Sequence, residues 1–317
     1  GSTATNEGTI TTHGQFALGM YAVNGSTATN EGTITTKGEG ANGMCAYDGS
    51  TATNEGTITT NGQFAYGMFA YGSGSTATNE GTITTHSYYA YGVYANGFGS
   101  TATNETGGTI TTNGDSAHGM YAWNYSTVTN ETEGTITTHG DSAYGMCADA
   151  SATATNKGTI TTHGQGALGM YAVSGSTATN ESGGKITTNG DYASGMYAWD
   201  GSTATNNGSI TTYGEVAHGM DAYGSDSEVE NWGTIITSDW GAYGMYADAG
   251  AMATNAGTIT TNGEEANGMY AYDSGSEVEN WGTITTNGWN AYGMCAYNDS
   301  TATNETGGTI TTHGNSA

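Results

Sequence analysis

A pattern of apolar and polar residues that begins at residues 2–22 recurs along the whole chain. Within it the apolar Ala4 stands between Thr3 and Thr5, and the apolar Ile10 follows Thr9. Such alternation with a period of two is typical of a half-buried strand. The pattern occurs in thirteen repeats spaced 24 to 27 residues apart, a period that indicates stacked structural repeats. The isoleucine that marks each repeat is Ile10, Ile34, Ile58, Ile83, Ile110, Ile136, Ile160, Ile186, Ile210, Ile235, Ile259, Ile284 or Ile310.

Substitutions between repeats indicate which positions face the solvent. Glutamate replaces both Thr3 and Thr5 in two repeats, whereas the position between them is always Ala or Val. The positions of Ile10 and Thr12 never change, so both are predicted to face the interior, with the threonine hydroxyl bonded within a ladder. The third segment, Ala-x-Gly-Met-x-Ala, keeps its alanines, and we interpret Gly19 as a bulge or a bend.

Three short strands and three corners in each repeat predict one coil of a solenoid. The corners fall at residues 6–8, 13–15 and 23–25, where Gly, Asn and Asp gather as tight bends require. The fold class is therefore predicted as all-β, a parallel right-handed β-solenoid of about 13 coils of 24–27 residues with three short strands per coil. Three internal ladders are expected: the amides of Asn6, Asn30 and Asn54, the isoleucines Ile10, Ile34 and Ile58, and the methionines Met20, Met44 and Met68.

The unbroken periodicity predicts one continuous β-solenoid over residues 1–317 rather than two domains. Because the chain opens at Gly1 inside the pattern and stops at Ala317 in mid-repeat, we interpret it as a window of a longer repeat protein. The net charge of −26, with no arginine, disfavours nucleic acid and anionic membranes as partners. No apolar run approaches the ~18 residues that a membrane helix needs, so no membrane insertion is expected.

The three cysteines, Cys45, Cys147 and Cys295, all occupy the position of Tyr21 in their repeats. Stacked strands lie ~4.8 Å apart, which places even the nearest two cysteines ~19 Å from each other. A disulfide requires Cα atoms within ~7 Å, so no disulfide is expected within the chain. If the Tyr21 position faces outward, the cysteines are exposed.

Groups that would carry catalysis do not converge in this sequence. β-Helical enzymes that cleave acidic polysaccharides use a basic residue and bound calcium, whereas the lysines here, Lys37, Lys157 and Lys185, are scattered. We therefore expect no enzyme and no catalytic residue. His139 and His163 stand in adjacent repeats, near enough to share a metal, but asparagine fills the same position elsewhere. That exchange favours exposed turn residues, and neither a metal nor a cofactor is expected.

Glutamate follows the ladder asparagine in six successive repeats and would form a ridge of like charges. Like charges directly opposite one another are destabilising, so either the turns splay or a divalent cation such as Ca²⁺ lies between them. Solvated carboxylates screened by salt are the favoured interpretation, and calcium is the alternative. The glutamate ridge consists of Glu7, Glu31, Glu55, Glu80, Glu105 and Glu131.

Outward-facing threonines and scattered aromatic residues offer two further surfaces. Thr9 and Thr11 begin Thr-x-Thr columns like those of some insect antifreeze solenoids, although Lys185 and Ile236 interrupt them. Threonine is also simply a good strand former, so ice binding is an alternative function. The tryptophans are candidate carbohydrate or protein contacts, on the third face (Trp123, Trp199, Trp240, Trp289) and at the first corner (Trp232, Trp281).

The repeat Asn-x-Gly-Thr-Ile-x-Thr-x-Gly-x-x-Ala-x-Gly-Met-Tyr-Ala resembles repeats in the passenger domains of large bacterial autotransporters (type V secreted proteins). The resemblance runs through the whole chain, as in Asn30-Glu31-Gly32-Thr33-Ile34 and Gly43-Met44-Cys45-Ala46. It implies a right-handed β-helical shaft outside the cell that is usually adhesive or aggregative. We therefore expect an extracellular, cell-surface structural protein, a stalk or filament segment that serves adhesion or cell–cell contact. Its expected partners are other copies of itself and a cell-surface receptor or glycan. An ice-binding protein and a polysaccharide-processing enzyme are the alternatives.

Overall fold

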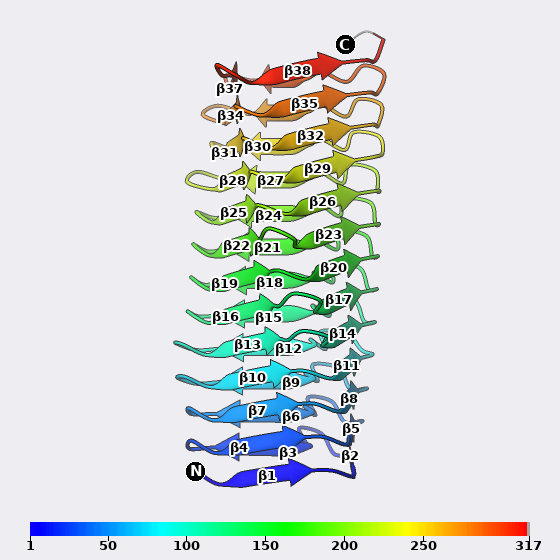
Figure 1. Ribbon diagram of the computed structural model, residues 1–317, viewed down its shortest axis with the longest axis vertical. Helices are drawn as coiled ribbons and strands as arrows, with labels where there is room; N and C mark the ends of the chain where they lie inside the picture. Colours follow the sequence, from blue (N-terminus) through cyan, green and yellow to red (C-terminus); the bar gives the residue numbers. More distant parts are fainter. Residues whose placement is uncertain (316–317) are drawn as a thin grey trace. The chain divides into compact units, whose positions relative to one another are not determined.

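The computed structural model describes residues 1–315, which form short strands joined by turns and bends (Figure 1). The chain divides into two compact units, Gly1–Ile160 and Thr161–Ala317. Each unit is a parallel β-solenoid with three strands per coil, so the predicted fold class is confirmed. Each sheet takes one strand from every coil, and successive strands pair in parallel. The strand β20 (Thr159–Thr162) contains the boundary between the two units.

In the first unit each coil contributes one strand to each of three sheets. The first sheet consists of β1 (Thr3–Asn6), β4 (Thr27–Asn30), β7 (Thr51–Asn54), β10 (Thr76–Asn79), β13 (Thr101–Asn104), β16 (Thr127–Asn130) and β19 (Thr153–Asn156). The second consists of β2 (Thr9–Thr12), β5 (Thr33–Thr36), β8 (Thr57–Thr60), β11 (Thr82–Thr85), β14 (Thr109–Thr112) and β17 (Thr135–Thr138). The third consists of β3 (Met20–Val23), β6 (Met44–Tyr47), β9 (Met68–Tyr71), β12 (Val93–Asn96), β15 (Met120–Trp123) and β18 (Met146–Asp149).

The second unit repeats this arrangement. Its first sheet consists of β22 (Thr177–Asn180), β25 (Thr203–Asn206), β28 (Glu228–Asn231), β31 (Met252–Asn255), β34 (Glu277–Asn280) and β37 (Thr301–Asn304). Its second consists of β23 (Lys185–Thr188), β26 (Ser209–Thr212), β29 (Thr234–Thr237), β32 (Thr258–Thr261), β35 (Thr283–Thr286) and β38 (Thr309–Thr312). Its third consists of β21 (Met170–Val173), β24 (Met196–Trp199), β27 (Met220–Tyr223), β30 (Met245–Asp248), β33 (Met269–Tyr272) and β36 (Met294–Tyr297).

The core of each coil is narrow and is filled by one isoleucine, one methionine or valine, and several alanines. In the first unit Ile10 pairs in register with Ile34, and Ile34 with Ile58. The methionines do the same on the third sheet, where Met20 pairs with Met44 and Met44 with Met68. So little apolar surface per coil cannot offset the conformational entropy of about 24 ordered residues. Stability therefore depends on stacking between coils.

An asparagine ladder runs through the first corner. The side-chain amide of Asn6 donates to Oδ1 of Asn30 at 2.7 Å, and the amide of Asn30 donates to Oδ1 of Asn54 at 2.7 Å. Both Asn30 and Asn54 are fully buried. Each amide thus satisfies its neighbour where a buried polar group would otherwise lack a partner. The ladder fixes the register of the corner from coil to coil.

The conserved threonine at the end of the second strand makes a different bond from the one predicted. In most interior coils the hydroxyl faces inward and donates within its own coil: Thr36 Oγ1 to the carbonyl oxygen of Ala41 at 2.6 Å, and Thr60 Oγ1 to that of Ala65 at 3.0 Å. The buried hydroxyl of Thr188 has no hydrogen bond. The prediction of a threonine ladder between coils is therefore wrong. The physical reason is that the alanine carbonyl of the next corner has no strand partner and lies within reach of the hydroxyl.

Glycine precedes every third strand because two neighbouring groups approach its Cα. Gly19 lies in a bend directly before β3. A Cβ on the equivalent Gly43 would lie 2.4 Å from Cγ2 of Ile58 and 2.5 Å from the carbonyl oxygen of Gly67. Residues 1–315 contain no helix, and hence none long and apolar enough to cross a membrane.

Candidate functional site

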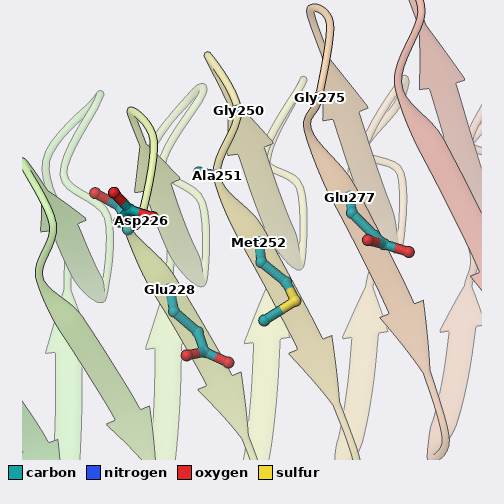
Figure 2. Close-up of a pocket in the computed structure, with 8 residues that line it drawn as sticks. Asp226, Glu228, Gly250, Ala251, Met252, Gly275 and Glu277 are labelled. Atoms are coloured by element: carbon teal, nitrogen blue, oxygen red, sulfur yellow. The ribbon is translucent and has the colours of Figure 1, made fainter.

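A concave surface of the second unit lies over three strands of its first sheet. Glu228, Met252 and Glu277 pair in register on β28, β31 and β34. Figure 2 shows their side chains projecting from the same face of the sheet, with Asp226 at the adjoining turn. They line a hollow of about 430 Å³ together with the small residues Gly250 and Gly275. The central side chain, that of Met252, is uncharged, so the carboxylates of Glu228 and Glu277 lie on two sides of the hollow.

Two tryptophans lie at the first corner, at the far ends of β28 and β34 and outside the lining of the hollow. Trp232 and Trp281 directly follow the strands β28 and β34, and 59% and 48% of their surfaces are exposed. The backbone N–H groups of Trp232, Ala256 and Trp281 donate to the ladder asparagines of successive coils, so all three occupy one column. A small alanine therefore separates two exposed indoles that lie two coils apart, ~9.6 Å along the stack. We call this surface, from Glu228 to Trp281, the acid–tryptophan groove.

Each indole is held against a carboxylate of its own coil. Nε1 of Trp232 donates to Oε2 of Glu230 at 3.4 Å, and Nε1 of Trp281 donates to Oε2 of Glu279 at 3.4 Å. Partial burial, with a smaller contribution from Glu230, raises the pKa of the Glu228 carboxyl. The groove therefore combines negative charge with flat apolar faces. That combination suits a ligand that has hydroxyl or cationic donors and an apolar face.

The groove offers no set of groups for a reaction. No histidine or lysine lines the hollow, and its one hydroxyl, that of Ser227, accepts the backbone N–H of Gly201 at 3.1 Å. Acid–base chemistry needs an acid and a base within hydrogen-bond reach of one another. Among residues 1–315, no three His, Cys, Asp or Glu side chains converge to hold a metal ion.

The structure places the predicted glutamate ridge in one column of the first unit. The backbone N–H groups of Glu31 and Glu55 donate to Asn6 and Asn30, and the ridge continues in the same way up to Glu131. The next residue in the column is Lys157, whose Nζ lies 2.8 Å from Oε1 of Glu131. This ion pair neutralises the charge of Glu131 at one end of the ridge. The ridge was predicted from the sequence, but the ion pair was not. Two histidines of the second corner lie beside asparagines of the next coil: Nδ1 of His86 is 3.2 Å from Nδ2 of Asn113, and Nδ1 of His163 is 3.4 Å from Nδ2 of Asn189.

The third sheet of the first unit carries a second layer of rings outside the core. Phe69, Tyr94 and Tyr121 stack in one column, with centroids 5.0 and 5.2 Å apart. A parallel column begins with Tyr66 and Tyr91, 5.3 Å apart, and continues through His118 and Tyr144. Burial among these rings lowers the pKa of His118 to about 3 and raises those of the tyrosines. These aromatic residues are therefore packed against one another rather than scattered.

This aromatic layer corrects the prediction for the cysteines. Cys45 and Cys147 are buried and Cys295 is half-buried, and all three are free. The Tyr21 position does face away from the core, but larger neighbours cover it: Cys45 lies among Tyr21, Tyr47 and Phe69. Burial raises the pKa of the Cys45 thiol to about 11, so it is neutral at pH 7.

One segment of the sequence that departs twice from the threonine pattern is a signal for the groove. The segment Ser-Glu-Val-Glu-Asn-Trp-Gly-Thr-Ile occurs twice, at residues 227–235 and 276–284, with one ordinary repeat between them. Each copy looks like a local departure from the threonine pattern. Only parallel stacking in register shows that the two copies flank a single hollow.

Comparison with known proteins identifies a family and supports the fold. The family model of the BigA third pectate lyase-like domain matches residues 1–54, 85–208 and 164–308. A chain in the cryo-EM structure of the Vag8–C1 inhibitor complex aligns with a TM-score of 0.64 at 19% identity, over 96% of this chain and 72% of that chain. The crystal structure of the TibC-catalysed hyper-glycosylated TibA55-350 fragment aligns over 98% of this chain and 99% of that one, at 18% identity and a TM-score of 0.29. No curated protein matches significantly.

Proposed function

The chain belongs to the family of the BigA third pectate lyase-like domain, and from that premise we propose that it is an adhesive segment of an autotransporter-type passenger, displayed outside the cell. In this role the β-solenoid is a scaffold, and the acid–tryptophan groove contacts a receptor or glycan on another cell. The exposed pair of tryptophans flanked by glutamates is the observation that carries the proposal. Exposed aromatic residues are a frequent source of binding energy at protein surfaces.

Two further points support a binding role. The repeat pattern resembles that of autotransporter passengers, and Vag8 was solved in complex with another protein, C1 inhibitor. The name of the family refers to a lyase-like fold, but we propose no enzymatic activity, because the groove brings together no acid, base and cation.

Binding of the fluorescently labelled chain to intact cultured animal cells and to bacterial cells tests the proposal. Flow cytometry is expected to show saturable binding to at least one cell type that unlabelled chain competes away. A parallel incubation with acidic polysaccharides, followed by the ultraviolet absorbance of unsaturated products, is expected to show no turnover. Turnover without saturable binding would replace the adhesive role by an enzymatic one.

Self-association in a fibre or bundle is part of the same proposal. A net charge of −26 makes identical copies repel one another at low ionic strength, and salt screens this repulsion. Sedimentation velocity is therefore expected to show larger species as the salt concentration rises. A single sedimenting species of one chain at every salt concentration would remove self-association from the proposal.

One observation favours ice binding as a second candidate function. The second sheet of the first unit holds exposed threonines in register, such as Thr33 with Thr57 and Thr57 with Thr82, and the hydroxyl of Thr109 donates to that of Thr82 at 3.1 Å. Regular rows of hydroxyl and methyl groups at strand spacing are the geometry that this function would need. Thermal hysteresis of the purified chain tests this candidate, and its absence would exclude it.

A further inference from the structure

In the second unit one column of the third sheet has aromatic residues on both sides of Asp221 and ends at Cys295. Tyr171 stacks on Tyr197 with ring centroids 5.5 Å apart, and Tyr246 stacks on Tyr270 at 5.7 Å. Between these two pairs, on β27, the chain has Asp221, which is in register with Tyr197 on β24 and with Tyr246 on β30. A short carboxylate therefore occupies the place of one ring.

A cavity of about 210 Å³ opens where this ring is missing. Tyr197 and Tyr246 form two of its walls, on strands that lie ~9.6 Å apart because one strand separates them. Tyr192 and Tyr223, both largely exposed, lie at the rim. One planar group fits between the two walls in the place that a tyrosine ring takes elsewhere in the column. We call this cavity the Asp221 slot.

The carboxylate in the slot is buried without a full set of partners. Asp221 is 7% exposed, the Ser194 hydroxyl is its one side-chain partner, and its Oδ1 atom has no hydrogen bond. Burial raises the pKa of this carboxyl to about 7. Burying a hydrogen-bond acceptor without a donor costs free energy. A ligand that supplies a donor removes this cost, and its binding is stronger for that reason.

The chain itself supplies no positive charge to the slot. His218 lines the cavity, but burial lowers its pKa to about 3, and its Nδ1 accepts the backbone N–H of Tyr243 at 2.9 Å. Within residues 1–315, neither lysine nor arginine lines the cavity. The Tyr246 hydroxyl donates to Oδ2 of Asp248 at 2.9 Å, while Oδ1 of Asp248 is buried without a partner. Two acidic groups thus give the slot a negative potential.

We propose that the Asp221 slot binds the guanidinium group of an arginine side chain presented by a partner protein or peptide. A guanidinium is planar, stacks on aromatic faces, donates in the plane to a carboxylate, and is less strongly hydrated than an ammonium group. Each property matches a feature of the slot: its two aromatic walls, its unpartnered oxygen and its burial. Because this chain contains no arginine, the partner is a different protein rather than a second copy. The proposal concerns a site separate from the acid–tryptophan groove and stands independently of it.

The first unit contains a matched break in the same column that lacks the charge. Cys45 lies between Tyr21 and Phe69, at a cavity of about 270 Å³. Its thiol accepts from the Asn42 amide at 3.5 Å and is neutral at pH 7. We therefore expect no guanidinium to bind at this cavity, which serves as an internal control.

Isothermal titration calorimetry of the whole chain with three capped tripeptides tests the proposal. The peptides carry arginine, lysine or citrulline at the central position. The arginine peptide is expected to bind, and the citrulline peptide, which has the same shape without the charge, to bind at least about tenfold more weakly. The lysine peptide is expected to be weaker as well, because an ammonium group does not stack as a plane.

Three variants locate the binding. Asp221→Asn keeps the shape of the slot and is expected to weaken the arginine peptide at least about tenfold. Asp221→Tyr fills the slot with the missing ring and is expected to abolish binding. Asp200→Asn, which removes the same charge from an exposed turn, is expected to leave affinity unchanged. Equal affinity for the arginine and citrulline peptides, no binding of the arginine peptide, or undiminished binding by a folded Asp221→Asn variant would overturn the proposal.

Discussion

Among single residues, this fold tolerates substitution least where the backbone of one coil lies directly against atoms of the next coil. Gly92 stands directly before β12, and a Cβ there would lie 2.3 Å from Cγ2 of Ile110 and 2.6 Å from the carbonyl oxygen of Gly119. Both obstacles belong to the next coil, and neither is the mobile end of a long side chain. The repeated glycine thus permits the close stacking on which every coil depends.

Replacing Gly92 by alanine is expected to lower the free energy of unfolding by about 2 kcal/mol or more, because the core has no room for a methyl group. Gly8→Ala is the control, since no atom lies within 4 Å of its added Cβ, and it is expected to change stability by no more than about 0.5 kcal/mol. Denaturant unfolding measures both variants. Equal stability of the two would contradict the close approach at Gly92.

Asp221 makes the stability of the second unit depend on pH. Its carboxyl has a pKa of about 7 when folded, against 3.8 ordinarily, because burial disfavours the charge. The titratable groups packed around it are Tyr197, His218, Tyr223, Tyr246 and Asp248. The folded state holds the proton more tightly than the unfolded chain, so stability is undiminished below about pH 4 and falls as the pH rises through 7. Asp221→Asn is therefore expected to raise the melting temperature at pH 8 and to have little effect at pH 4. A difference that is the same at both pH values would show that the carboxyl is not desolvated.

At the scale of elements, the asparagine ladder holds the first corner. The amide of Asn104 donates to Oδ1 of Asn130 at 2.8 Å and to the carbonyl oxygen of Gly108 at 3.0 Å, and its own Oδ1 accepts from Asn79 at 2.7 Å. One side chain thus links three coils. Its loss leaves buried groups on both neighbouring coils without partners.

Asn104→Ala is expected to destabilise the protein by about 3 kcal/mol, because buried donors and acceptors lose their bonds together. Asn113→Ala changes an exposed asparagine of the same coil and is expected to have an effect below about 1 kcal/mol. Thermal unfolding followed by circular dichroism compares the two. A small effect at both positions would mean that the ladder adds little to stability.

The repeat period and the alternation of residues sufficed to predict the coils, because these features act within one coil and its register. Which side chains Cys45 and Asp221 meet could not be predicted in this way. Both positions point away from the core, and their burial depends on rings such as Phe69 and Tyr246 that neighbouring coils supply. The groove was missed for the same reason, since Trp232 and Trp281 become neighbours only through lateral stacking. Alternation within one coil distinguishes inside from outside but does not show what covers the outside.

Across the whole molecule, the residues that form the scaffold differ from those that form the candidate binding surfaces. Ladders of Asn, Ile and Met repeat with little change, whereas the surface carries local departures at the acid–tryptophan groove and the Asp221 slot. The net charge of −26 favours partners with positive charge and makes their association sensitive to salt. Binding of cells by the labelled chain is therefore expected to weaken as the salt concentration rises, which the same flow-cytometry assay measures. Binding that strengthens with salt would indicate an apolar rather than an acidic contact.

We propose that the acid–tryptophan groove is the cell-binding surface. Attachment of beads coated with the chain to the cells identified by flow cytometry, counted under shear flow, tests it most directly. The double variant Trp232→Ala with Trp281→Ala is expected to reduce attachment about tenfold or more, because exposed tryptophans at a binding surface each contribute on the order of 1–2 kcal/mol. The control double variant Trp199→Ala with Trp240→Ala removes two exposed indoles elsewhere in the same unit and is expected to retain attachment. Full attachment by a folded Trp232→Ala, Trp281→Ala chain would contradict the claim.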